Sequence, residues 1–245
     1  IMGFALSSGQ KWNSGYLYIA VLQIILTGIL VFSLPLWKGR SAGGETDSAA
    51  EGKALSLGEI IRISGAREIM LCFFCYCALE QTSGLWASSY LTLFKSIPAE
   101  TAARFAGLFY IGITVGRALS GFLTMKLNDV QMIRLGQGII AAGILTLFLP
   151  GPAFLSLAGL ILIGLGCAPV YPCIIHSTPA HFGADKSQAV IGVQMASAYI
   201  GTCIMPPIFG LIANHISVGL FPLYLLLILL IMFIMHELLT RKTAH

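Results

Sequence analysis

The sequence predicts an all-α integral membrane protein in which seven helices cross the bilayer. Hydrophobic residues make up 57% of the 245 residues and charged residues only 10%, whereas soluble domains carry about a quarter charged residues. The mean hydropathy is +0.87. Apolar segments long enough to cross about 30 Å of hydrocarbon recur along the chain, and Lys and Arg gather between them. No alternation typical of strands competes with these segments.

Seven spans are expected, separated by polar connections or by connections that contain Pro and Gly. The first span ends in Trp37 and is followed by cations, as is typical of a membrane interface. The second contains Glu80 and the third contains Arg117, while Pro150, Gly151 and Pro152 mark a tight turn after the fourth. The expected ranges are 16–37, 68–94, 105–125, 132–149, 154–175, 189–213 and 220–238.

The spans divide the chain into three parts. Residues 1–40 hold the first span, residues 41–66 form a linker, and residues 67–245 hold a block of six spans. The start of the linker is rich in Gly, Ser, Ala and Glu and has no apolar period. Ser56 and Glu59 then have the spacing of a capping box, and the next apolar residues lie mostly on one side. This pattern predicts a short helix on the membrane surface.

The positions of the cations predict how the spans are oriented. Seven spans place the two ends of the chain on opposite sides of the membrane. One side receives Lys38, Arg40, Lys53, Arg62, Arg67, Lys126, Arg134, Lys186, Arg241 and Lys242, and the other receives Lys11, Lys95 and Arg104. The positive-inside rule makes the first side cytoplasmic, so the N-terminal end is expected outside and the C-terminus in the cytoplasm. The net charge of +4 therefore reflects membrane flanks and does not indicate nucleic-acid binding.

Motifs in four spans resemble a known transporter family. The second span reads Ala78-Leu79-Glu80, Gly84-Leu85-Trp86 and Ser89-Tyr90-Leu91, similar to the seventh helix of major facilitator transporters of the fucose-permease-like sugar:proton symporter branch. The third has Gly116-Arg117 and Gly121, followed by Lys126 and Arg134, similar to the loop motif between helices eight and nine. The fifth, through GLGCAPVYP (164–172), and the sixth resemble helices ten and eleven; the residues of the sixth are Gly192, Gln194, Ala198, Gly201, Pro206, Pro207 and Gly210.

The resemblance implies a fold, a function and a partner. Residues 67–245 are expected to form the C-terminal six-helix bundle of a transporter, and residues 1–40 to hold the last helix of its N-terminal bundle. The rest of that bundle lies outside this chain and is the expected partner. The resemblance implies alternating-access secondary transport of a small polar solute, a sugar, with proton coupling, in the plasma (inner) membrane. It implies no cofactor and no enzymatic activity.

Glu80 is the candidate centre of the binding site. It lies about thirteen residues from either end of its span, which at 1.5 Å per residue places it near the midplane. Desolvation disfavours the charged form of a carboxylate, so Glu80 could bind a proton or accept hydrogen bonds from a sugar. The alternative is a neutral Glu80 that only hydrogen-bonds a neighbouring helix.

Further polar residues are expected to line the same cavity. Tyr76, Ser83, Ala87 and Tyr90 share the face of Glu80 by their spacing. Trp86 could stack on a sugar ring, or it could only fill space between helices. The candidates for contact with substrate or proton are Glu80, Gln81, Trp86, Tyr76, Tyr90, Tyr171, Gln194 and Ser197.

Arg117 and several Gly and Pro residues are candidates for gating or structure. A guanidinium in lipid is costly, so Arg117 is expected to pair with Asp129, Asp185 or the carbonyls of a helix C-terminus; substrate contact is the alternative. The glycines of the third span predict close helix packing, and prolines inside spans predict kinks that suit alternating access. Ordinary membrane-helix usage is the alternative for both. The residues are Gly107, Gly112, Gly116, Gly121, Pro169, Pro172, Pro206 and Pro207.

Other function classes have less support. Cys72, Cys75 and Cys77 lack the further ligands that a zinc site needs, so no metal is expected. His176 and His181 are interpreted as loop histidines beyond the fifth span. No GxxxxGK[ST] loop indicates ATP coupling. A seven-helix receptor or channel is an alternative, although the last span lacks the lysine that binds retinal, and a non-transporting fragment is another.

Overall fold

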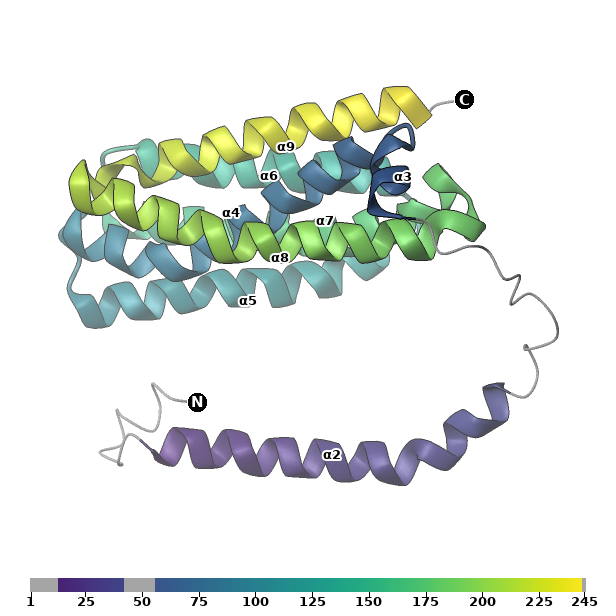
Figure 1. Ribbon diagram of the computed structural model, residues 1–245. Helices are drawn as coiled ribbons and strands as arrows, with labels where there is room; N and C mark the ends of the chain where they lie inside the picture. Colours follow the sequence, from purple (N-terminus) through teal and green to yellow (C-terminus); the bar gives the residue numbers. More distant parts are fainter. Residues whose placement is uncertain (1–12, 42–55, 244–245) are drawn as a thin grey trace. The chain divides into compact units, whose positions relative to one another are not determined.

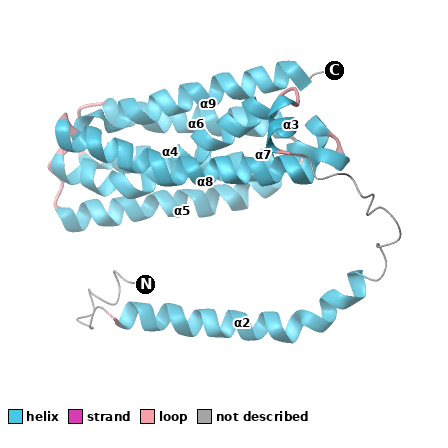
Figure 2. Ribbon diagram, in the orientation of Figure 1, coloured by secondary structure: helices cyan, strands magenta, loops and turns pink. Residues whose placement is uncertain are grey.

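The computed structural model describes residues 13–41 and 56–243, without the side chains of residues 34–41 and 184. In these ranges the chain is helical and contains no strand (Figures 1 and 2). Seven of the helices are long and apolar enough to cross a membrane. The all-α membrane fold expected from the sequence is therefore confirmed. The Gly- and Ser-rich start of the linker, Lys53 and Lys11 lie outside the described residues.

The chain separates into two compact units, Ile1–Lys53 and Ala54–His245. The first unit contains α2 (Ser14–Ser41), whose apolar stretch Ser14–Ser33 is a candidate span. Large apolar side chains are exposed all around this helix, including Tyr16, Ile24 and Phe32. A helix that is apolar on every side is typical of a membrane span.

The second unit contains the short helix α3 (Leu57–Arg62) and six long helices. Ser56 and Glu59 form the capping box that the sequence predicts, because each backbone N–H bonds the side chain of the other residue. The Arg67 side chain donates to the Ile61 carbonyl oxygen at 3.1 Å and ties α3 to the next helix. The position of α3 on a membrane surface stays a prediction.

The six long helices correspond to the last six expected spans. They are α4 (Ala66–Leu93), α5 (Ala99–Leu123), α6 (Asp129–Phe148), α7 (Ala153–Phe182), α8 (Ala184–His215) and α9 (Phe221–Thr243). Helix α5 begins directly after Pro98, and an exposed ion pair between Glu100 and Arg104 lies on its polar first turns. Because these turns are polar, hydropathy predicted a start at residue 105, whereas the helix begins at Ala99.

Helices α4 and α7 form the centre of the unit (Figure 1). Helix α4 packs mainly on α8 and α9, and α7 packs mainly on α5 and α6. The unit therefore consists of two helix triplets, α4–α6 and α7–α9, in which the first helix of each triplet packs on the second and third helices of the other. Because each triplet has an odd number of membrane-crossing helices, the second triplet starts on the opposite side of the membrane and runs in the opposite direction. This is the pairing pattern of an inverted repeat, as in many secondary transporters.

Two of the four glycines expected to bring α5 close to a neighbour do so. A Cβ on Gly116 would lie 2.8 Å from the Leu165 carbonyl oxygen of α7, and a Cβ on Gly112 would collide with the carbonyl of Ile161. Gly107 and Gly121 instead face open space, so the expectation was wrong for these two. The packed pair has the four-residue spacing that keeps both positions on one helix face.

Helices α6 and α7 also meet through glycine. A Cβ on Gly136 would lie 2.6 Å from the Gly166 carbonyl oxygen, and a Cβ on Gly166 would lie 2.6 Å from the Gly136 carbonyl oxygen. The two backbones are therefore in direct contact at this point. Such close approach supplies the dispersion contacts that hold helices together where lipid provides no hydrophobic drive.

The prolines lie inside continuous helices. Helix α7 runs through Pro169 and Pro172, and α8 runs through Pro206 and Pro207. Near the second pair, the Pro206 carbonyl accepts a bond from the indole N–H of α4, and Tyr224 Oη donates to the Met205 carbonyl at 2.8 Å. Side chains from two neighbouring helices thus hold the segment in which proline removes backbone donors. The kinks themselves stay a prediction.

Candidate functional site

Glu80 lies at the middle of α4 and is partly exposed, whereas Leu79 and Ser83 beside it are buried. Its carboxylate interacts with Tyr76 on the same helix and acts electrostatically on Cys167 and Tyr171 of α7. The acid therefore lies at the side of α4 that faces α7. A carboxyl group at the centre of an apolar span is costly, so such groups commonly mark sites of binding or proton exchange.

Tyr171 connects Glu80 to further helices. Its ring centroid lies 5.0 Å from that of Phe73 and 6.2 Å from that of Tyr76, so aromatic side chains of α4 and α7 pack together. Its hydroxyl lies 3.4 Å from the Met195 sulfur of α8. The side chains that act electrostatically on its phenol include Glu80 of α4, Arg117 of α5 and Tyr199 of α8.

These neighbours define the central site, which consists of Glu80, Arg117, Tyr171 and Tyr199. Each of α4, α5, α7 and α8 contributes one of the four side chains. Arg117 is exposed and Tyr199 is 68% exposed, so both are accessible from outside the unit. Together they offer a carboxyl, a guanidinium and two phenols, which can both donate and accept hydrogen bonds. Charged groups at this depth indicate a face that lines a polar cavity or is covered by protein.

Arg117 does not have the ion-pair partners that were expected. Within residues 56–243 no salt bridge joins it to Asp129 or Asp185; Asp129 Oδ2 instead lies 2.7 Å from His176 Nδ1. Asp129 is the first residue of α6, which packs on α7, so its carboxylate pairs with His176 of α7 and not with Arg117 of α5. The charge of Arg117 acts electrostatically on Tyr171, so Arg117 is grouped with the central site, and its contact with substrate stays a prediction.

The tyrosine stripe of α4 is buried in the unit and does not line a polar cavity. Tyr76 and Tyr90 are each 1% exposed, and Ser83 and Ala87 are fully buried. The Tyr76 hydroxyl donates to the Cys167 carbonyl at 3.1 Å, and the Tyr90 hydroxyl donates to the Leu147 carbonyl at 2.9 Å. Buried hydroxyl groups need such partners. Of this stripe, Glu80 alone is accessible, and the expectation of a continuous cavity lining was wrong.

Three further candidates make contacts between helices. The Ser197 hydroxyl donates to the Met70 carbonyl at 3.0 Å, which joins α8 to α4. Gln194 is fully buried and shares a 3.2 Å hydrogen bond with Thr178 of α7. Trp86 Nε1 donates to the Pro206 carbonyl at 3.0 Å, and its ring packs edge-on against Phe209. These contacts favour structural roles, whereas Gln81 remains partly exposed beside Glu80.

Replacing Trp86 with Phe separates its two possible roles. The variant keeps an aromatic ring beside Phe209 but loses the hydrogen bond to Pro206, so we expect a loss of about 1 kcal/mol of stability, seen as a lower Tm. Leu85→Phe, at an exposed position of the same helix, is the control and should leave Tm unchanged. A variant with unchanged Tm but impaired solute binding would instead make Trp86 a substrate contact.

A cavity of about 500 Å³ lies where α5, α6 and α7 approach the end of the unit. It is lined by Ser120, Thr124, Leu127, Asn128, Asp129, Pro172, Cys173 and His176. His176 and His181 both lie inside α7, which continues to Phe182, so their interpretation as loop histidines was wrong. The last turns of α7 contain polar residues, so hydropathy ended the expected span too early. The hydroxyl groups of Ser177 and Thr178 donate hydrogen bonds to the Ile174 carbonyl oxygen within the helix.

The described residues give no sign of a metal centre. No group of three or more His, Cys, Asp or Glu is arranged there to hold a metal ion. The cysteines are free thiols, and all except Cys203 are buried. Buried thiols of this kind pack as small apolar side chains.

Comparison with known proteins identifies the family. The profile of the Major Facilitator Superfamily matches residues 69–245, which is most of the chain. The chain belongs to the Major Facilitator Superfamily. Sialin of Homo sapiens is 27% identical over 123 residues, which cover 49% of this chain and 24% of sialin. The membrane protein MosC of Rhizobium meliloti is 24% identical over 206 residues, covering 82% of this chain and 48% of MosC.

A solved structure supports the same fold. A mutant of the peptide transporter POT in complex with alafosfalin superposes with a TM-score of 0.61 at 16% identity, covering 73% of this chain and 39% of that chain. This likeness concerns the fold alone. The chain spans less than half of the length of each of these relatives.

Proposed function

We propose that the protein is a secondary active transporter and that the central site is half of its solute-binding site. The superfamily match and the transporter-like fold support secondary transport. The observation that carries the proposal is that Glu80 of α4, Arg117 of α5 and Tyr199 of α8 all act electrostatically on Tyr171 of α7. Glu80, Tyr171 and Tyr199 lie near the middle of their helices, and Arg117 lies six residues before the end of α5. Secondary transporters bind their solutes near the midplane, between repeated halves. The other half of the site would come from an N-terminal bundle.

The proposed solute is small and polar, and a sugar is the first candidate. The motifs of α4 resemble the fucose-permease-like branch, and a carboxyl group beside two phenols can bond several hydroxyl groups. Proton coupling would follow if Glu80 exchanges a proton during the cycle. This proposal also gives Tyr199 a function that its spacing on α8 did not suggest.

Arg117 favours a second candidate, an organic anion such as a sugar acid. Its guanidinium is exposed, and no ion pair within residues 56–243 neutralises it. A guanidinium binds carboxylates with paired hydrogen bonds. A neutral sugar would leave this charge without a counter-ion in the membrane, whereas an anionic solute would neutralise it.

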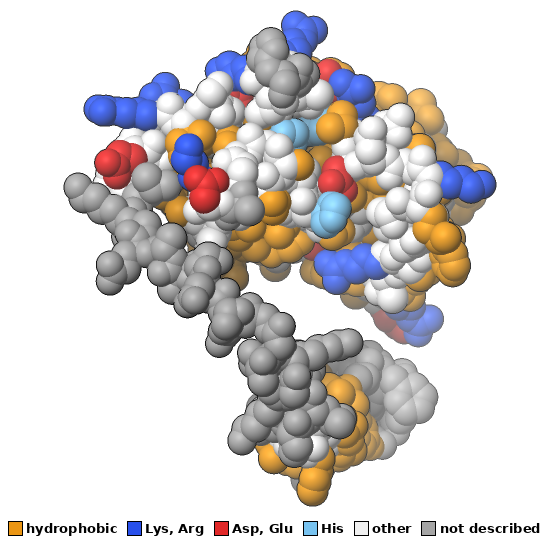
Figure 3. Space-filling model, turned by 90° about the vertical axis from the view of Figure 1, so that its right-hand side faces the viewer, with side chains coloured by type: hydrophobic (Ala, Val, Ile, Leu, Met, Phe, Trp, Pro, Cys, Tyr) orange, Lys and Arg blue, Asp and Glu red, His pale blue; other side chains and the backbone are white. Residues whose placement is uncertain are grey.

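We propose that the end of the unit where α4 begins and α9 ends faces the cytoplasm. Described cations of this end include Arg62, Arg67, Lys186, Arg241 and Lys242, and Figure 3 shows Lys and Arg side chains around its rim. Lys95 and Arg104 lie toward the opposite end. The positive-inside rule supports this orientation in a plasma (inner) membrane. The cavity at His176 would then open toward the cytoplasm.

A solute screen with one site variant tests the proposal. The full-length transporter is reconstituted in proteoliposomes and offered neutral hexoses, sugar acids and dipeptides. Arg117→Gln should raise KM for a sugar acid by roughly tenfold, as expected for a lost charged hydrogen bond, and should leave uptake of a neutral sugar unchanged. Lys95→Gln, on the same unit but outside the site, is the charge-matched control. Uptake of none of these solutes would contradict the proposed substrate classes.

A further inference from the structure

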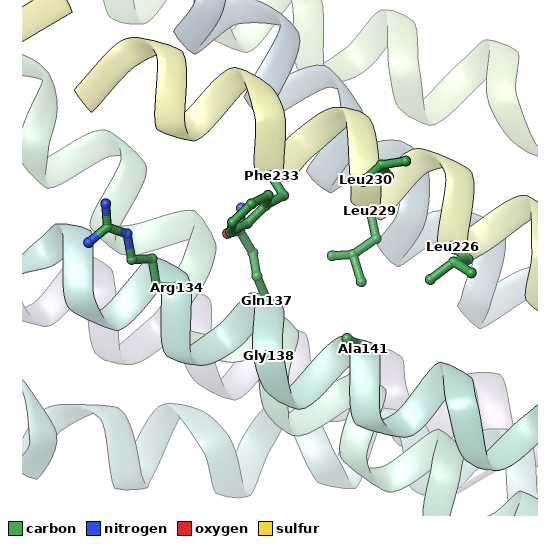
Figure 4. A pocket seen from close by; sticks show the side chains of 8 residues that line it. All are labelled: Arg134, Gln137, Gly138, Ala141, Leu226, Leu229, Leu230 and Phe233. Atoms are coloured by element: carbon green, nitrogen blue, oxygen red, sulfur yellow. The ribbon is translucent and has the colours of Figure 1, made fainter. Parts of the chain in front are cut away.

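A groove of about 310 Å³ lies between α6 and α9. Helix α6 contributes Arg134, Gln137, Gly138 and Ala141, and α9 contributes Leu226, Leu229, Leu230 and Phe233 (Figure 4). Neither helix contributes to the central site. The groove is therefore a separate feature that solute binding does not explain.

The groove is polar at one end and apolar at the other. Arg134 lies near the start of α6, and Ala141 lies two turns further, about 10 Å along the axis. Because α9 runs in the opposite direction, Phe233 lies beside Gln137 and Leu226 lies toward Ala141 (Figure 4). At the polar end Arg134 makes a paired contact with Glu237, from Nε to Oε1 at 2.7 Å and from Nη2 to Oε2 at 2.8 Å.

Gln137 is the unusual residue of this groove. It is 3% exposed, and neither its side-chain oxygen nor its side-chain nitrogen has a hydrogen-bond partner among the described residues. A buried amide without a partner is unfavourable, so such a group points to a ligand. Figure 4 shows the side chain directed toward α9. Phe233 of α9 lines the same groove and is 43% exposed, so its ring can change rotamer at the groove surface.

The surface around the groove indicates whether the groove faces lipid or water. Up to Leu238 the exposed side chains of α9 are all apolar, and they are Leu223, Leu227, Leu230, Ile231, Phe233, Ile234 and Leu238. A helix face of this composition in a membrane protein is suited to contact with acyl chains. The groove thus lies on an apolar face and has charged residues at one end.

We propose that the groove binds one zwitterionic glycerophospholipid of the leaflet at the Arg134 end. An acyl chain would lie along Leu226, Leu229 and Leu230. An ester oxygen would accept a hydrogen bond from the Gln137 amide, one helical turn deeper than Arg134. A phosphate oxygen would accept from Arg134 Nη1, because the contacts to Glu237 use Nε and Nη2. Since Arg134 and Glu237 neutralise each other, a head group with one charge of each sign fits better than an anionic one.

Lipid retention by the whole purified chain tests this site. Dioleoyl phosphatidylethanolamine and dioleoyl phosphatidylglycerol are added together to the protein in detergent. Native mass spectrometry should then show one bound phosphatidylethanolamine in preference to phosphatidylglycerol. Gly138→Leu should weaken this binding by roughly tenfold, which corresponds to a lost well-fitted contact. A Cβ on Gly138 meets nothing within 4 Å, so leucine does not clash there and its side chain enters the groove. Gly107→Leu on α5 makes the same change at another open glycine and should retain the lipid.

A second variant tests the role of the amide. Added phosphatidylethanolamine should raise the Tm of the wild type, whereas Gln137→Leu should start from a higher lipid-free Tm and gain much less from lipid. Unchanged lipid retention in Gly138→Leu, or equal loss in Gly107→Leu, would overturn the site. Equal retention of phosphatidylglycerol would overturn the assignment of a zwitterionic head group.

Discussion

Glu80→Gln is expected to reduce pH-driven uptake by the full-length transporter to less than roughly a tenth of the wild-type rate. Glutamine keeps the size of the side chain and its ability to form hydrogen bonds, but it cannot exchange a proton. The carboxyl group lies at the middle of α4 and acts electrostatically on Tyr171, and we expect a proton and a solute to compete for it there. Initial uptake rates in proteoliposomes, with and without an imposed pH gradient, measure the effect.

Exchange of solute without a pH gradient distinguishes coupling from binding. If Glu80 only carries the proton, the Gln variant should still exchange labelled for unlabelled solute. Glu68→Gln is the matched control, because it makes the same change on the same helix. Glu68 pairs with Lys242 at 2.6 Å at the end of the unit and lies outside the central site. Normal pH-driven uptake by Glu80→Gln would remove Glu80 from proton coupling.

Gly136→Leu is expected to prevent stable assembly of the six-helix unit. A Cβ at this position would lie 2.6 Å from the Gly166 carbonyl oxygen and 2.8 Å from Val170 Cγ2. Because backbone blocks the new side chain, α6 and α7 must separate, at a cost of about 3 kcal/mol or more. The better helix propensity of leucine returns only about 1 kcal/mol. Monodisperse yield in detergent and the thermal unfolding midpoint measure the loss.

Gly138→Leu on the same helix is the control for this change. Its Cβ meets open space, so in detergent without added lipid the variant should fold as well as the wild type or slightly better. The two variants have the same composition and differ only in the helix face that they alter. Equal stability of the two would show that the contact between Gly136 and Gly166 contributes little to the packing of α6 on α7.

The fold was largely predictable because a bilayer restricts the possible solutions. Span length, cations between spans and the capping box of Ser56 are local signals, and each has its counterpart in the structure. The spacing of Gly112 and Gly116 also predicted their packed face. Gly107 and Gly121 show the limit of composition, because a glycine brings helices together only on a face that another helix already covers.

The central site was less predictable, because it depends on which helices meet. Glu80 could be found, since a deep carboxyl group is conspicuous in an apolar span. Tyr199 and the setting of Arg117 could not, because spacing along one helix does not tell which face its neighbours leave open. Tyr90 was misplaced for the same reason: its hydroxyl bonds a carbonyl of α6, which no pattern within α4 reveals.

The interlocked pairing of the helices has a consequence for biosynthesis. Helices leave the ribosome in chain order, yet α4 packs mainly on α8 and α9, which are made after α5, α6 and α7. Helices α5 and α6 both find their main partner in α7. During translation the first three helices of the unit therefore reside in the membrane with most of their packing surfaces unmatched, and lipid or an insertion chaperone must cover them. Glu80 would enter its final surroundings only after Tyr171 on α7 and Tyr199 on α8 have been synthesised.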